Sequence, residues 1–97
     1  MLPVVWSVRF EKDFDAVANY LFENWGVNKV QEVHDEIVSI TDQIAQMPEM
    51  FPSTKKKAKT RYAVVTKQLT IFYKIHKKEI TLITLFDTRQ NPSKRKL

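Results

Sequence analysis

The sequence predicts an α+β fold: an N-terminal strand, an antiparallel two-helix hairpin and then a three-stranded antiparallel meander that forms one sheet packed on the helices. Three observations support this. Apolar residues recur at helical spacing through residues 10–47, and three β-branched and aromatic runs with short polar connectors fill residues 61–86. A loop rich in proline and lysine, residues 47–60, separates the two patterns. The 97 residues suit one domain spanning 1–97.

The N-terminal segment predicts one short strand followed by a helix. The run PVVWS is β-branched and aromatic, as strands are, and Ser7 can then cap a helix. Gly26, the one glycine of the sequence, ends this helix, because glycine most readily adopts the left-handed conformation of a C-cap. The apolar stripe between these two residues is Phe10, Phe14, Val17, Leu21 and Trp25.

A second helix is predicted directly after the glycine. Asn28 and Gln31 have the spacing of a capping box, and Pro48 ends the helix. Because the linker between the helices is so short, they must fold back as an antiparallel hairpin. The apolar seam of the second helix alternates spacings of three and four: Val30, Val33, Ile37, Ile40, Ile44 and Met47.

Three strands are predicted in the C-terminal half, at RYAVV (61–65), LTIFYKI (69–75) and ITLITLF (80–86). The connectors TKQ and HKKE are short enough to require antiparallel pairing. The last strand is apolar on both faces, so we expect it at a central position, and we expect the N-terminal strand to extend the sheet. Strict alternation in the last strand places Ile80, Leu82, Thr84 and Phe86 on one face and Thr81, Ile83 and Leu85 on the other.

The charge is divided along the chain. Residues 1–52 carry three basic and nine acidic side chains, a net −6, whereas residues 53–97 carry thirteen and two, a net +11. So many like charges favour a polyanionic or acidic partner. The candidate residues for binding a target or partner are Lys55, Lys57, Lys59, Arg61 and Arg89.

The two arginines flank the meander. Arg61 opens its first strand and Arg89 follows its last, and these two strands run in the same direction, so we expect the arginines at opposite ends of the sheet. Arg89 either contacts a partner or simply ends the strand, paired to Asp87 or solvated.

The composition argues against several classes of site. Without cysteine there is no disulfide or thiolate chemistry, and this fits a cytoplasmic protein. No run approaches the roughly 20 apolar residues of a membrane span, so we expect no membrane partner. His34 and His76 lack zinc-ligand spacing. We therefore expect no metal and no cofactor.

A metal-independent ribonuclease site is a further possibility. It needs cations at the scissile phosphate and a group that moves the 2′-hydroxyl proton. Arg61 and Arg89 are candidates for the first role, and Tyr62, Tyr73 and His76 for the second. Tyr73 lies inside a predicted strand, as core residues do, and His76 lies at a predicted turn, so the proton-transfer half of the site is weakly represented.

The order of strand, helical hairpin and meander resembles the RelE/ParE family of toxins from bacterial type II toxin–antitoxin systems. The resemblance implies a toxin that inhibits growth and is neutralised by a cognate acidic antitoxin, with which it forms a hetero-oligomer. The segments that carry it are VVWS (4–7), YLFENW (20–25), MPEMFP (47–52), LTIFYKI (69–75) and LFDTRQNP (85–92).

The family has two activities, so the resemblance leaves open whether the chain is an enzyme. RelE-like members cut mRNA on the ribosome, whereas ParE-like members poison DNA gyrase. RelE-like members carry an arginine where this chain has Thr70, and a late catalytic Tyr or His-Tyr where it has QNP (90–92). Arg61 and Arg89 match arginines of both branches. The departures favour a ParE-like toxin acting on gyrase; the alternatives are a ribosome-dependent mRNA endonuclease and a non-toxic nucleic-acid-binding module.

Overall fold

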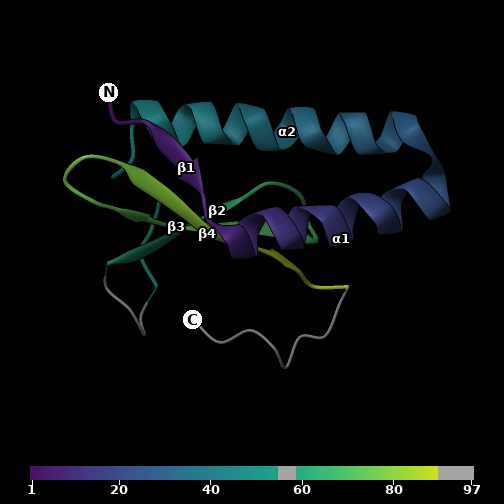
Figure 1. The fold of residues 1–97 in the computed structure, drawn as a ribbon. Coiled ribbons are helices and arrows are strands. Elements are labelled where there is room, and N and C mark those ends of the chain that lie inside the picture. Colours follow the sequence, from purple (N-terminus) through teal and green to yellow (C-terminus); the bar gives the residue numbers. More distant parts are fainter. Residues whose placement is uncertain (55–58, 90–97) are drawn as a thin grey trace.

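A two-helix hairpin covers one face of a four-stranded sheet (Figure 1). The computed structural model describes residues 1–54 and 59–89. The element order is the predicted one: β1 (Val4–Trp6), α1 (Val8–Trp25), α2 (Val27–Gln46), β2 (Thr60–Val64), β3 (Leu69–Ile75) and β4 (Ile80–Asp87). Within the described residues, neither helix is long and apolar enough to cross a membrane.

The sheet is mixed, with strand order β1-β4-β3-β2. β2, β3 and β4 pair antiparallel, as predicted for the meander, and β4 occupies the expected central position. β1 does extend the sheet, but it pairs parallel with β4, with Val4 opposite Ile80. A parallel neighbour needs a long crossover connection, which the helical hairpin and the first two strands of the meander supply.

A β-bulge interrupts the pairing of β3 with β4. Strict alternation placed Leu85 on the face opposite to Ile80 and Leu82, yet all three residues lie in the core. That prediction was wrong because one extra residue in the strand exchanges the two faces beyond the bulge. The same shift places Asp87 opposite the buried Leu69, on the face that the helices cover.

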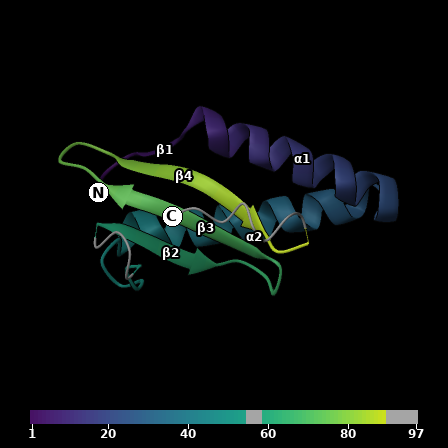
Figure 2. The ribbon, with the colours of Figure 1, turned by 90° about the horizontal axis from the view of Figure 1, so that it is seen from below.

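The core lies between the hairpin and this face of the sheet. The helical hairpin extends past the end of the sheet (Figures 1 and 2), which explains why Trp25, the last residue of the predicted stripe, is 57% exposed. Most other positions of the predicted stripes are buried, whereas Phe14, Val30 and Ile40 are partly buried and Met47, at the end of the second stripe, is exposed. The buried core residues are Phe10, Val17 and Leu21 of α1, Val33, Ile37 and Ile44 of α2, and Ala63, Leu69, Ile71, Tyr73, Ile80, Leu82 and Leu85 of the sheet.

Ser7 caps α1 as predicted. Its hydroxyl oxygen accepts a hydrogen bond from the Phe10 amide at 3.0 Å, and the hydroxyl donates to the Ile83 carbonyl of β4 at 2.7 Å. One side chain thus satisfies a free helix donor and a strand carbonyl just beyond the point where β1 ends. Asp13 continues this role one and a half turns later, where its carboxylate accepts from the Leu85 amide at 3.1 Å.

The predicted capping box of α2 is wrong. Gly26, with φ 87°, both ends α1 and precedes α2, so α2 begins at Val27 and has no side-chain cap. Asn28 therefore lies inside the first turn, and Gln31 donates to Asp35 at 2.9 Å instead of reaching back. One glycine serves two helix ends and leaves no separate capping position.

Candidate functional site

The structure separates the two candidate arginines along β3. Arg61 lies opposite Tyr73 and Asp87 lies opposite Leu69, four residues apart on the same strand, or about 14 Å. Arg89 lies two residues after Asp87 and is hydrogen-bonded to it, so the expected separation of the two arginines is confirmed. Of the three lysines named as candidates with these arginines, Lys55 and Lys57 lie outside the described residues.

Arg61 fastens the loop after α2 to the sheet. Its guanidinium donates to the carbonyl oxygens of Phe51, at 2.6 Å, and Glu49, at 3.2 Å. The same loop pairs with the outer edge of β2, where the Tyr62 amide donates to the Pro52 carbonyl at 3.0 Å. A guanidinium occupied by main-chain carbonyls has a structural role that the sequence pattern did not reveal.

Tyr73 is a core residue with an engaged hydroxyl. Its side chain is fully buried and donates to the Pro48 carbonyl at 2.6 Å. Burial raises the pKa of Tyr73 to about 12, against the opposing effect of the positive charge on Arg61. At neutral pH the phenol is therefore protonated, and its proton is already donated within the fold.

The remaining proton-transfer candidates, Tyr62 and His76, do not lie with Tyr73 on one surface of the sheet. Tyr62 lies opposite Phe72, one position along from the Arg61–Tyr73 pair, so it projects from the other face of the sheet. His76 is exposed in the β3–β4 turn, where its backbone amide donates to the Glu79 carbonyl at 2.8 Å. The four candidate catalytic residues, Arg61, Arg89, Tyr73 and His76, thus form no single constellation.

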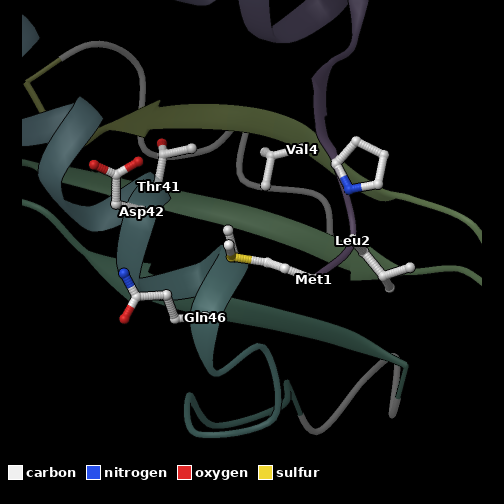
Figure 3. A pocket seen from close by; sticks show the side chains of 8 residues that line it. Met1, Leu2, Val4, Thr41, Asp42 and Gln46 are labelled. Carbon is white, nitrogen blue, oxygen red and sulfur yellow. The ribbon is translucent and has the colours of Figure 1, made fainter.

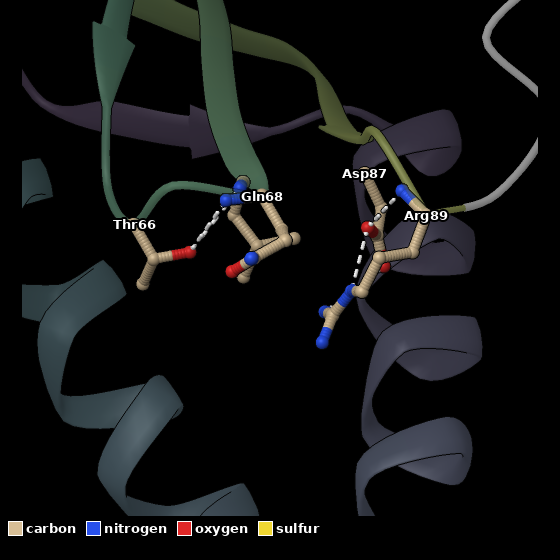
Figure 4. Close-up of polar contacts among 5 residues, drawn as sticks. Thr66, Gln68, Asp87 and Arg89 are labelled. Atoms are coloured by element: carbon tan, nitrogen blue, oxygen red, sulfur yellow. Dashed lines mark hydrogen bonds and ion pairs between the residues drawn. The ribbon is translucent and has the colours of Figure 1, made fainter.

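Arg89 ends β4 in a bidentate pair with Asp87. Its Nε and Nη2 donate to the two carboxylate oxygens at 3.0 and 3.1 Å, and its backbone amide donates to Oδ1 at 2.9 Å (Figure 4). The guanidinium also lies over the ring of Tyr20 on α1, 5.0 Å from its centroid. The Asp87 side chain is 1% exposed and that of Arg89 28%. The pairing with Asp87 was one of the roles considered for Arg89 from the sequence, and it gives the buried carboxylate a charged hydrogen-bond partner.

Four lysines, exposed except for the half-buried Lys74, gather at the other end of the sheet. Lys59 immediately precedes β2, Lys74 lies near the end of β3, and Lys77 and Lys78 form the β3–β4 turn. We call these four residues the lysine end. Only Lys59 was a candidate from the sequence. The others lie in the connector HKKE and the strand before it, and antiparallel pairing of that strand with β2 could have placed them beside Lys59.

A cavity of about 450 Å³ lies between the N-terminal segment and α2 (Figure 3). Met1, Leu2, Pro3 and Val4 line one side, and Thr41, Asp42, Ala45 and Gln46 the other. Its single carboxylate, that of Asp42, has no histidine or lysine beside it in this lining. Across residues 1–54 and 59–89, no three His, Asp or Glu side chains are grouped to hold a metal ion.

The chain matches a family model, and its fold matches solved toxin structures. The model is that of the ParE toxin of the type II toxin–antitoxin system parDE, over residues 4–92. No curated protein matches the sequence.

Three solved structures show the fold. The chromosomal ParDE system from P. aeruginosa has a TM-score of 0.71 at 15% identity, covering 90% of this chain and 96% of that one. The E. coli DinJ–YafQ complex has a TM-score of 0.63 at 12% identity, covering 92% and 96%. The YoeB dimer from Staphylococcus aureus has a TM-score of 0.64 at 10% identity, covering 88% and 94%. Because the family model matches residues 4–92 of the 97, this chain belongs to the ParE toxin family of type II toxin–antitoxin systems.

Proposed function

We propose that this toxin arrests growth by binding DNA gyrase in the cytoplasm, rather than by cutting RNA, and that an acidic antitoxin neutralises it. The main observation behind this proposal is that three candidate catalytic side chains, those of Arg61, Tyr73 and Arg89, already form hydrogen bonds within the fold. A metal-independent ribonuclease needs a proton-transfer group and phosphate-binding cations within hydrogen-bond reach of one substrate. Here the Tyr73 hydroxyl is buried and bonded, and Arg61 is bonded to loop carbonyls. Arg89 lies at the opposite end of β3.

The family membership supports a protein target. One departure from the RNA-cutting branch supports a gyrase target, since Thr70 stands where that branch carries an arginine. Thr70 is only partly buried, beside the central strand, and its side chain offers no positive charge to a phosphate.

The charge of the chain supports the antitoxin. Two of the similar structures are described as toxin–antitoxin assemblies, the ParDE system and the DinJ–YafQ complex. The net +11 of residues 53–97 suits an acidic partner, and electrostatic steering of this kind raises association rates by roughly 10–10³. We expect a hetero-oligomer of toxin and antitoxin.

Two assays on the same induced cells and purified toxin test the proposal. The toxin should inhibit supercoiling by purified gyrase, and primer extension on translated mRNA should show no new ends. If a short reading frame for an acidic protein lies beside the gene, its co-expression should restore growth. Cuts within translated codons, with supercoiling unaffected, would instead establish the ribosome-dependent endonuclease. Unimpaired growth on overexpression would favour the non-toxic nucleic-acid-binding module.

A further inference from the structure

We infer that the lysine end, formed by Lys59, Lys74, Lys77 and Lys78, binds the phosphate backbone of duplex DNA. The proposed function uses these four lysines only through the net charge of residues 53–97, and not through their position in the fold. They lie at the end of the sheet opposite to the Asp87–Arg89 pair, and away from the tip of the helical hairpin (Figure 2).

The strand register brings the lysines together from three segments. Lys74 lies opposite Thr60 of β2 on one side and Thr81 of β4 on the other, so the three strands present their ends side by side. Two interstrand spacings make this edge about 10 Å wide. Lys59 precedes Thr60 at one side of it, and the turn with Lys77 and Lys78 closes the other.

These lysines form no ion pair with residues 1–54 or 59–89. The ion pairs found in the described part of the chain lie elsewhere, on α2 and at the Asp87–Arg89 end. Glu79 is the one acid of the β3–β4 turn, and it accepts a hydrogen bond from Thr81 at 3.4 Å. Four cations against one acid concentrate positive potential at a single edge.

Duplex DNA matches this edge in charge density. It carries one phosphate per roughly 1.7 Å of helix axis with both strands counted, so a length of about 10 Å carries about six phosphates for the four lysines. Lysine ammonium groups bind phosphates as point charges and need no fixed fork geometry, which suits side chains on a turn.

A peptide partner fits the edge less well. A peptide that docks through apolar anchors needs exposed apolar side chains or a groove, whereas Thr60 and Ile80, which flank the lysines in the strands, are buried. Met47 and Met50 on the loop after α2 are exposed, so an acidic peptide belongs in the test. A toxin bound to gyrase lies beside the DNA that gyrase holds; this last step rests on the proposed function, but the charge and geometry do not.

The test is the salt dependence of binding to a fluorescent 20-bp duplex, measured by anisotropy between 50 and 200 mM salt. Four phosphate contacts predict a log–log slope of about −3.6 and a loss of affinity of roughly 100-fold over this range. The double variant Lys77→Gln, Lys78→Gln should reduce the steepness by about 2. Lys67→Gln is the matched control: Lys67 is exposed in the β2–β3 turn, at the other end of the sheet, and its loss should leave the slope unchanged.

Three outcomes would overturn the inference. They are undetectable duplex binding at 50 mM salt, an equal loss of slope in Lys67→Gln, and polyglutamate binding as tightly as the duplex with the same sensitivity to the turn variants. The last would assign the lysine end to an acidic protein. Gyrase inhibition, measured on the same preparations, separates the two proposals, since a toxin that inhibits gyrase but ignores duplex DNA refutes this inference alone.

Discussion

Tyr73→Phe separates a structural tyrosine from a catalytic one. The substitution removes the hydrogen bond to the Pro48 carbonyl, 2.6 Å long in the native fold, and leaves that carbonyl without its partner. A net hydrogen bond and a partly unsatisfied carbonyl together amount to about 1–2 kcal/mol of unfolding free energy. For a chain of this size we expect a fall in Tm of roughly 5–10 °C. Toxicity at permissive temperature should persist.

The same variant has a distinct dependence on pH. Burial raises the pKa of Tyr73 to about 12 in the folded state, whereas the ordinary value is about 10. The folded state therefore holds this proton more tightly, so the contribution is fully present below pH 10 and is lost as the pH rises towards 12. The loss at pH 11 is about 1.4 kcal/mol, close to the value of the hydrogen bond. Wild type and Tyr73→Phe should thus have equal stability near about pH 11.

Urea unfolding at pH 7 to 12, followed by circular dichroism, measures both effects. Tyr62→Phe is the control, because Tyr62 is only partly buried on the other face of the sheet and its hydroxyl forms no hydrogen bond with the described residues. It should match wild type in stability at pH 7. The reasoning is refuted if Tyr73→Phe is as stable as wild type at pH 7 and yet abolishes toxicity, which would make Tyr73 part of the chemistry.

Three further substitutions test contacts that stabilise the fold, each by its effect on the unfolding free energy in urea. Arg89→Ala leaves the Asp87 carboxylate, which is 1% exposed, without its charge partner and should lower the unfolding free energy by about 2–3 kcal/mol. A second change, Asp87→Asn, should recover much of this loss. Equal stability of Arg89→Ala and wild type would show that the pair does not stabilise the fold. Ser7→Ala should cost about 1–2 kcal/mol, since it removes the α1 cap and a bond to β4, and a neutral result would contradict the capping role. Gly26→Ala should cost about 1–2 kcal/mol through its φ of 87° alone, as a Cβ there meets open space; no loss would mean that the helix junction relaxes.

The order and type of every element followed from the sequence, and β3 was predicted to the residue as Leu69–Ile75. Hydrophobic periodicity, one glycine and Pro48 were sufficient for this. The β-bulge was not predictable, because β4 is apolar on both faces and an extra residue leaves no break in its pattern. The direction of β1 was also beyond the sequence, since its three residues carry no signal of their neighbour.

The candidate site was predicted less well than the fold. The sequence identified Arg61 as a cation, but its partners are main-chain carbonyls, which have no sequence signature. The pair of Arg89 with Asp87 was one of several roles considered, because the two residues are only two positions apart in the sequence. The lysines of the β3–β4 turn were overlooked because the candidates were chosen by their position in the sequence. Lys59 and Lys77 lie at the same end of the sheet only because β2 pairs antiparallel with β3.

The arginines and the turn lysines differ in their contacts within the fold, and this difference determines how mutants of this toxin should be interpreted. Arg61 and Arg89 are each held by partners within the fold, so their loss lowers stability whether or not they contact a target. Reduced toxicity in Arg61→Ala or Arg89→Ala therefore counts as a lost contact only where the unfolding free energy is unchanged. Lys77 and Lys78 are exposed and form no ion pair with the described residues, so their substitution changes surface charge and little else. An effect on target, antitoxin or DNA binding at the lysine end can be assigned to the interface directly.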